Sequence, residues 1–169
     1  MIILLRHLLA ILILPFSVAV LVPAWIARDC SVVPALGRSV GAVFLQGTGV
    51  ALLGVGLVFF VASVWRFATQ GQGTLAPWDP PRVLVVSGPY QYVRNPMISG
   101  VIFVLFGEAL MLLSRPHGIW AVGFVVLNLI YLPFVEEPGL ERQFGDSYRE
   151  YGRHVRRFIP RLRPWRPSP

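Results

Sequence analysis

The chain has 169 residues, 55% of them hydrophobic, and its mean hydropathy is +0.65. This hydropathy excludes an ordinary soluble domain and is typical of a membrane protein. The length predicts one domain over residues 1–169. The net charge is +7, and eight of the 15 basic residues, all of them arginine, follow residue 141; such a cluster could bind nucleic acid, but beside membrane spans it indicates contact with anionic lipid. The single cysteine, Cys30, excludes an internal disulfide and a cysteine-cluster metal site, and since the three histidines lack ligand spacing we predict no metal.

Four apolar stretches are predicted to cross the membrane as helices, and the first is long enough to cross about 30 Å of hydrocarbon. These predicted spans cover residues 2–26, 40–67, 97–113 and 119–135. The first could instead be a signal peptide, but its apolar run continues past the poor cleavage site at Ala19, so we favour a retained span that Pro15 kinks. Small residues in the second span should let another helix approach closely, and they are Gly41, Gly47, Gly49, Gly54 and Gly56.

The longest polar, turn-rich segment ends at residues 87–100, just where the third span begins. Gly88-Pro89 and Asn95-Pro96 are turn signals, and Pro96 suits the first position of a helix. Arg94 and the free N–H groups of that helix start would form an anion-binding corner at the membrane surface. The alternative is an interfacial loop whose tyrosines and arginine only anchor it at the membrane boundary.

The third and fourth spans are joined by a tight link and should form an antiparallel hairpin. Glu108 and Asn128 then lie at similar depth, and a protonated Glu108 bonded to Asn128 is a better explanation than a proton relay. The hairpin also makes Arg94 a neighbour of Glu136-Glu137, which end the fourth span.

Residues 136–157 are charged and amphipathic, which predicts a helix at the membrane surface. Gly145 weakens this helix or breaks it. Its apolar stripe consists of Leu140, Phe144, Tyr148 and Tyr151. Because most arginines flank the termini and the long loop, the positive-inside rule predicts that both termini and the functional loop are cytoplasmic. We expect an all-α integral membrane bundle of about four spans, in a bacterial inner membrane.

The motifs from about Gly88 to Arg161 resemble the isoprenylcysteine carboxyl methyltransferase and phospholipid methyltransferase superfamily. The matching elements, in order, are Gly88-Pro89-Tyr90, Val93-Arg94-Asn95-Pro96-Met97, Glu136-Glu137, Phe144-Gly145 with Tyr148 and Tyr151, and Pro160-Arg161. The common pattern is Arg-His-Pro-x-Tyr. Here Asn95 stands in place of His and Ile98 in place of Tyr, which removes an acid–base group and a hydroxyl.

The resemblance implies a small membrane enzyme of the S-adenosylmethionine-dependent methyltransferase class (EC 2.1.1 type), acting on a membrane-soluble or lipid-like acceptor. Arg94 and Glu137 would be the catalytic residues and would hold opposite ends of the cofactor. The implied cofactor-binding residues are Gly88, Pro89, Tyr90, Tyr92, Arg94, Asn95, Pro96, Glu136, Glu137 and Tyr148.

In that arrangement Arg94 would take the carboxylate of the cofactor, Glu136 or Glu137 its ammonium or ribose hydroxyls, and the tyrosines its adenine or sulfonium. The residues alone leave simpler explanations open. Glu136-Glu137 could be a charge pair at a helix N-terminus, and the tyrosines could be interfacial anchors. A non-catalytic scaffold or lipid-binding protein is the main alternative function, and a transporter or assembly subunit that uses Glu108 is a third. The expected partners are the bilayer and a lipophilic acceptor, not nucleic acid.

Overall fold

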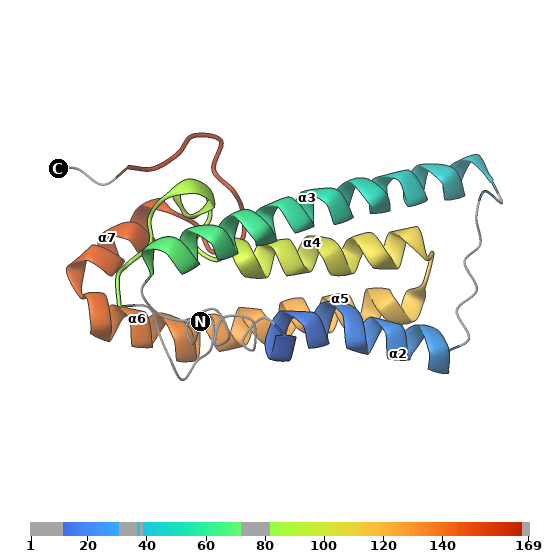
Figure 1. Cartoon of the computed structure of the whole chain (residues 1–169), viewed down its shortest axis with the longest axis horizontal. Coiled ribbons are helices and arrows are strands. Elements are labelled where there is room, and N and C mark those ends of the chain that lie inside the picture. The colour runs from blue at the N-terminus through green and yellow to red at the C-terminus, as the bar shows by residue number, and fades with distance from the viewer. Residues whose placement is uncertain (1–11, 31–36, 38, 72–81, 167–169) are drawn as a thin grey trace. The chain divides into compact units, whose positions relative to one another are not determined.

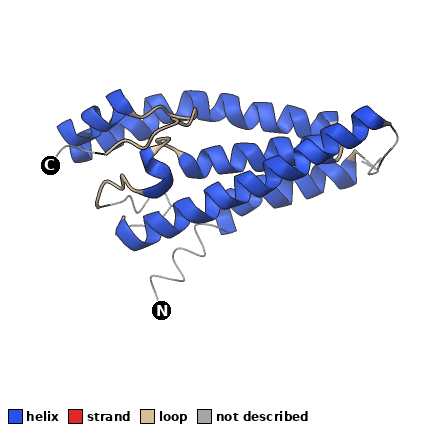
Figure 2. Cartoon of the chain, turned by 90° about the horizontal axis from the view of Figure 1, so that it is seen from above, coloured by secondary structure: helices blue, strands red, loops and turns tan. Residues whose placement is uncertain are grey.

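The computed structural model describes residues 12–30, 37, 39–71 and 82–166, and every regular element in these ranges is helical, as the sequence predicts (Figures 1 and 2). The elements in chain order are the π-helical segment η1 (Leu12–Leu21), α2 (Val22–Asp29), α3 (Val40–Gln70), the 3₁₀ turn η2 (Gly88–Gln91), α4 (Pro96–Met111), α5 (Arg115–Tyr131), the π-helical turn η3 (Leu132–Glu136), α6 (Glu137–Phe144) and α7 (Asp146–His154).

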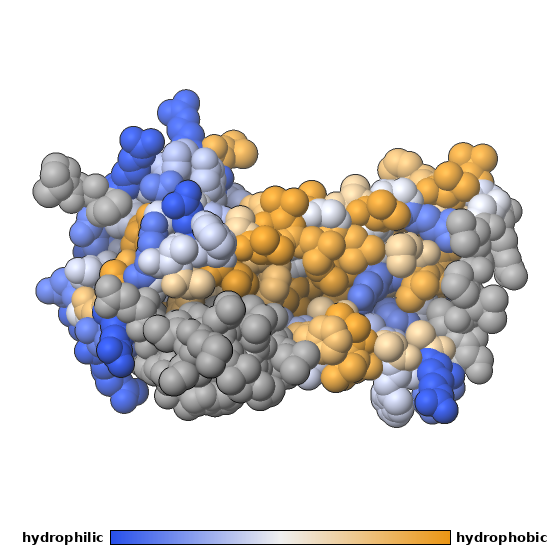
Figure 3. Space-filling model, viewed as in Figure 1, coloured by the Kyte–Doolittle hydropathy of each residue, from blue (hydrophilic) through white to orange (hydrophobic). Residues whose placement is uncertain are grey.

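Two helices in the described part of the chain are long and apolar enough to cross a membrane: α3, and the continuous run Arg115–Phe144. Only 17% of the most apolar window in each is buried, and large side chains such as Phe44, Trp65 and Phe134 are more than two-thirds exposed. Apolar surface of this extent suits lipid rather than water, and Figure 3 shows it along α3. Helix α4 is apolar but shorter, and residues 2–11 of the first predicted span lie outside the described residues.

The described residues belong to two compact units, of which the first comprises residues 1–58 and 100–125. Here α3 and α4 approach so closely that a Cβ atom on Gly49 would lie 2.7 Å from the carbonyl oxygen of Gly107, and one on Gly56 would lie 2.7 Å from that of Gly100. Close packing is therefore confirmed at two of the five predicted glycines. Gly47 and Gly54 have no such neighbour.

Replacing Gly107 with alanine should lower the thermal stability of the protein in detergent, because the new Cβ would lie 2.8 Å from backbone atoms of Gly49 and Leu53. Helix backbones cannot yield as a flexible side chain can, so we expect a cost of about 1–3 kcal/mol. The matched control is Gly54→Ala, which meets open space and should gain about 0.5–1 kcal/mol from helix propensity. Equal unfolding temperatures for the two variants would contradict this packing.

In the first unit, hydrogen bonds also join η1 and α2 to α5. Trp120 donates from Nε1 to the carbonyl oxygen of Val18 at 3.1 Å. That carbonyl is available because its partner in a π-helix would be residue 23, and Pro23 has no N–H. His117 bonds the carbonyl oxygen of Pro23 through Nε2 and the hydroxyl of Ser114 through Nδ1, which explains a buried histidine without a metal.

The second unit comprises residues 59–99 and 126–169, and it contains all the predicted site residues. The helix that contains the fourth predicted span does not end at residue 135: it continues through Pro133 by the π-helical turn η3 and runs on to Phe144. The span itself stays a prediction. A turn of this kind accommodates the missing N–H of a proline. The predicted pair of Glu108, in the first unit, with Asn128, in the second, stays a prediction.

The single helix expected over residues 136–157 is two helices, α6 and α7. Gly145 separates them because it adopts φ +56°, a left-handed conformation that glycine takes at no steric cost. The four residues of the predicted apolar stripe nevertheless pack in one cluster, together with Val155, Leu84, Val86 and Trp165.

Candidate functional site

The turn η2 is held against the end of α3 within the second unit. Gly88 adopts φ +59°, and a Cβ atom there would lie 3.0 Å from Nε of Arg66. The hydroxyl of Ser87 donates to Oε1 of Gln70. Phe67 and the ring of Tyr90 share a buried cluster, so α3 fixes the position of the loop that leads to Arg94.

The chain after α7 lies along this loop; we name residues 155–166 the C-terminal segment (Figure 1). Four backbone N–H···O bonds join the two pieces: Arg94 to Arg156 at 2.8 Å, Asn95 to Arg157 at 3.2 Å, Arg161 to Tyr92 at 2.9 Å and Trp165 to Gln91 at 3.0 Å. The backbone N–H groups of Arg94 and Asn95 are therefore taken by the protein itself. Helix α4 begins at Pro96, as predicted.

A group of charged side chains gathers around Glu137, at the start of α6. Arg157 donates from Nε and Nη2 to the two carboxylate oxygens of Glu137, the second at 2.7 Å. Nη1 of Arg94 lies 3.2 Å from Oε1 of the same carboxylate. In this group of two cations and one anion, the side chains of Arg94 and Glu137 are only 13% and 14% exposed, whereas that of Arg157 is 38% exposed.

Arg94 and Glu137 are therefore neighbours, as the predicted hairpin required, but they do not stand at opposite ends of a ligand. Glu137 instead holds Arg94 in place. Nε of Arg94 is buried and has no hydrogen-bond partner among the described residues. Gly152 on α7 leaves room for the guanidinium, because a Cβ atom there would lie 3.2 Å from Nη1 of Arg94.

Tyr148 belongs to the same group and is 6% exposed. Burial raises the pKa of its phenol to about 12, the carboxylate of Glu137 adds to this, and a hydrogen bond with Arg94 acts in the opposite direction. The phenol therefore keeps its proton at neutral pH and can donate a hydrogen bond. We name Arg94, Glu136, Glu137, Tyr148 and Arg157 the charge cluster.

Tyr90 and Tyr151 are buried residues that connect the loop to α7. The hydroxyl of Tyr151 donates to the carbonyl oxygen of Tyr90 at 2.7 Å. Burial raises the pKa of Tyr90, and Tyr151 and Glu136 raise it further. The hydroxyl of Tyr90 is buried and has no hydrogen-bond partner in the described part of the chain. Tyr148 and Tyr151 are both buried in the second unit, so the interfacial anchor that the sequence left open does not hold for these two tyrosines.

Glu136 differs from Glu137 because, within the described residues, its carboxylate accepts no hydrogen bond and forms no ion pair. It lies close enough to Tyr90 and Tyr148 to influence the pKa of both phenols. The cluster therefore offers the free carboxyl group of Glu136 and one unpaired guanidinium N–H of Arg94, and the neighbouring Tyr90 adds one unpaired phenol. These are the groups that the ammonium, the carboxylate and the hydroxyls of S-adenosylmethionine require, so the residues fit this cofactor.

Sequence reasoning missed Arg157, Tyr151 and Gly152 as parts of this site. Arg157 was only one of eight C-terminal arginines, and no local pattern connects it with a carboxylate 20 residues earlier. Of the predicted site residues, the structure brings Arg94, Glu136, Glu137 and Tyr148 together. Gly88, Pro89, Tyr90, Tyr92, Asn95 and Pro96 shape the loop that presents Arg94.

Among the described residues, no three His, Cys, Asp or Glu side chains lie close enough to hold a metal ion, and the absence of a metal stays a prediction. A comparison with protein families gives a match to the model described as phospholipid methyltransferase, over residues 45–147. No curated protein and no solved structure matches significantly. The matched range includes α4, α5, the loop with Arg94 and both glutamates of the charge cluster.

Proposed function

The chain belongs to the phospholipid methyltransferase family, and from this premise we propose that it transfers a methyl group from S-adenosylmethionine to a membrane-soluble or lipid-like acceptor. The observation that carries the proposal is the buried, unpaired Nε of Arg94, within a range that the family covers. Two membrane-length helices in the same chain agree with a lipophilic acceptor. When bound, the cofactor supplies an electrophilic methyl group on a sulfonium.

In this proposal Arg94 binds the carboxylate of the cofactor through its guanidinium N–H groups. Glu136 accepts from the ammonium or the ribose hydroxyls, and Tyr148 donates from its neutral phenol. Glu137 and Arg157 position Arg94 rather than meeting the cofactor at its far end. Methyl transfer needs alignment of the two reacting atoms more than acid–base chemistry. The amide of Asn95 in place of an imidazole is therefore compatible with the reaction.

Titration of the purified protein in detergent with S-adenosylhomocysteine tests the cofactor directly. We expect saturable binding by calorimetry, with a loss of affinity in Glu136→Gln, because the amide keeps the shape of the side chain but offers one acceptor oxygen in place of two. Glu150→Gln is the control, since Glu150 is exposed on α7 and forms no ion pair in the described part of the chain. A wild-type protein that binds no S-adenosylhomocysteine would favour the alternative function, a non-catalytic scaffold or lipid-binding protein.

Gly152→Ala gives a sharper test of the position of Arg94. A Cβ atom on Gly152 would lie 3.2 Å from Nη1 of Arg94 and would displace the guanidinium by a few tenths of an ångström. Alanine also strengthens the helix by about 0.5–1 kcal/mol. We therefore expect weaker S-adenosylhomocysteine binding, several-fold by calorimetry, in a protein whose unfolding temperature is unchanged or higher. Wild-type affinity in this variant would remove Arg94 from the cofactor site.

We further propose a membrane arrangement of four spans with both termini and the charge cluster on the cytoplasmic side of a bacterial inner membrane. The positive-inside rule supports it. In a Cys30→Ser background, cysteines placed at the exposed positions Arg115 and Leu162 should react with an impermeant maleimide from opposite sides of the membrane. Labelling of both from the same side of sealed vesicles would contradict the arrangement.

A further inference from the structure

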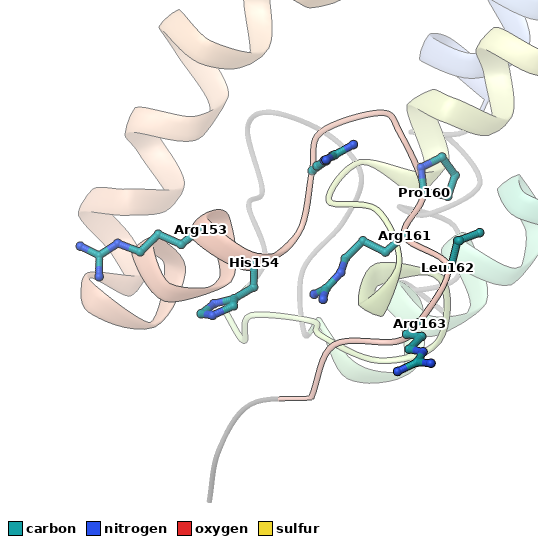
Figure 4. Close-up of a pocket in the computed structure, with 7 residues that line it drawn as sticks. Arg153, His154, Pro160, Arg161, Leu162 and Arg163 are labelled. Carbon is teal, nitrogen blue, oxygen red and sulfur yellow. The ribbon is translucent and has the colours of Figure 1, made fainter.

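A cavity of about 530 Å³ lies between the end of α7 and the C-terminal segment (Figure 4). Four arginines and one histidine make up most of its lining, and it has no acidic residue. The lining residues are Arg153, His154, Arg156, Pro160, Arg161, Leu162 and Arg163. None of these residues has a role in the proposed methyl transfer, so that reaction does not account for the cavity.

The arginines of this cavity are not neutralised by the protein. In the described part of the chain none of the four forms an ion pair, whereas Arg94, Arg149 and Arg157 each do. Nη1 of Arg161 is buried and has no hydrogen-bond partner among the described residues. Figure 4 shows Arg161 extending from the C-terminal segment toward His154 at the end of α7. Buried guanidinium N–H groups without an acceptor call for an anion.

The surroundings of the cavity indicate where that anion comes from. Leu162, in the lining, is fully exposed, and Ile159, in the same segment, is 63% exposed. The ring of Trp165 stacks on His154 with 5.4 Å between centroids, which places an indole next to the same cavity. Exposed aliphatic side chains, a tryptophan and several arginines together are typical of a segment at the boundary between headgroups and hydrocarbon.

We propose that this cavity binds the phosphate of an anionic phospholipid. Arg161, whose Nη1 is buried and unpaired, would bind the phosphate, and Arg156 and Arg163 line the same cavity. Leu162 lies against the acyl chains. Arginine suits this role because its planar fork gives two parallel hydrogen bonds to phosphate oxygens. Such a lipid would hold the C-terminal segment, and with it the loop that presents Arg94, at the membrane surface.

The test is titration of the full chain, purified in a neutral detergent, with dioctanoyl phosphatidic acid. Dioctanoyl phosphatidylcholine and inorganic phosphate serve as separate arms. We expect saturable binding of the anionic lipid, tighter than that of either other ligand. The variant Arg161→Gln with Arg163→Gln should weaken it at least about tenfold, because two charge-assisted contacts are lost.

The matched control is Arg142→Gln with Arg166→Gln, which loses the same net charge at two exposed arginines outside the cavity. We expect less than about a twofold change in the control, since general attraction between charges is screened by salt. Arg163→Gln alone changes an exposed position and should lower the affinity for the anionic lipid several-fold. This single variant replaces the double variant in the test if the double variant unfolds. Equal losses in the two double variants, no preference over phosphatidylcholine, or binding of inorganic phosphate without the lipid would each overturn the proposal.

Discussion

Glu137→Ala is expected to lower the free energy of unfolding by about 2–4 kcal/mol, the largest effect of any single substitution at the site. The carboxylate holds Arg157 through two hydrogen bonds and Arg94 at 3.2 Å, and the side chain is 14% exposed. Its removal leaves two guanidinium groups close together without an anion. The cost stays below that of a fully buried pair because the side chain of Arg157 is 38% exposed.

Glu141→Ala on the same helix is the control for this prediction. Glu141 also pairs with an arginine, Arg149, but the two side chains are 43% and 56% exposed. An exposed pair of this kind contributes about 0–1 kcal/mol. Chemical denaturation in detergent should therefore separate the two variants clearly. If both variants lose the same small amount of unfolding free energy, the charge cluster contributes no more to stability than an exposed ion pair does.

Arg94→Ala is expected to weaken binding of S-adenosylhomocysteine by roughly ten- to a hundredfold, the range that corresponds to the loss of one charge-assisted contact of about 1.5–3 kcal/mol. The unpaired Nε of Arg94 is the donor that we assign to the cofactor carboxylate. Arg94→Lys should restore only part of the affinity, because an ammonium cannot reproduce two parallel N–H bonds.

Arg142→Ala provides a comparison of equal charge, since Arg142 is exposed on α6 and lies outside the charge cluster. Its affinity for S-adenosylhomocysteine should match that of the wild type. Tyr131→Phe, at the end of α5, removes one hydroxyl away from the cluster and should also have little effect. Wild-type affinity in a folded Arg94→Ala protein would contradict the assignment.

The positions of the helices could be predicted from patterns along the chain. So could the proximity of Arg94 to Glu136-Glu137. Apolar runs marked α3, α4 and α5 to within a few residues at most ends. The short link before α5 implied the hairpin that brings Arg94 to Glu137. The break at Gly145 was left open, since sequence alone does not decide whether a glycine adopts a positive φ.

The contacts that complete the site could not be predicted, because they depend on backbone hydrogen bonds and distant pairs. The C-terminal segment pairs with the loop through N–H and C=O groups that every residue carries, so no side-chain pattern marks it. Tyr151 reaches a carbonyl oxygen 61 residues away. The continuation of the helix through Pro133 could not be predicted either. A proline ordinarily ends a helix, and here the π-helical turn accommodates it.

The transfer of a labelled methyl group tests the central claim most directly. The purified protein would be incubated with S-adenosylmethionine labelled in its methyl group and with lipid extracted from host membranes, and the organic phase would be counted. We predict label in a lipophilic product with the wild type and with Tyr131→Phe, and a loss of at least about tenfold with Arg94→Ala at limiting cofactor. No label above the protein-free blank, or equal transfer by Arg94→Ala, would contradict the account.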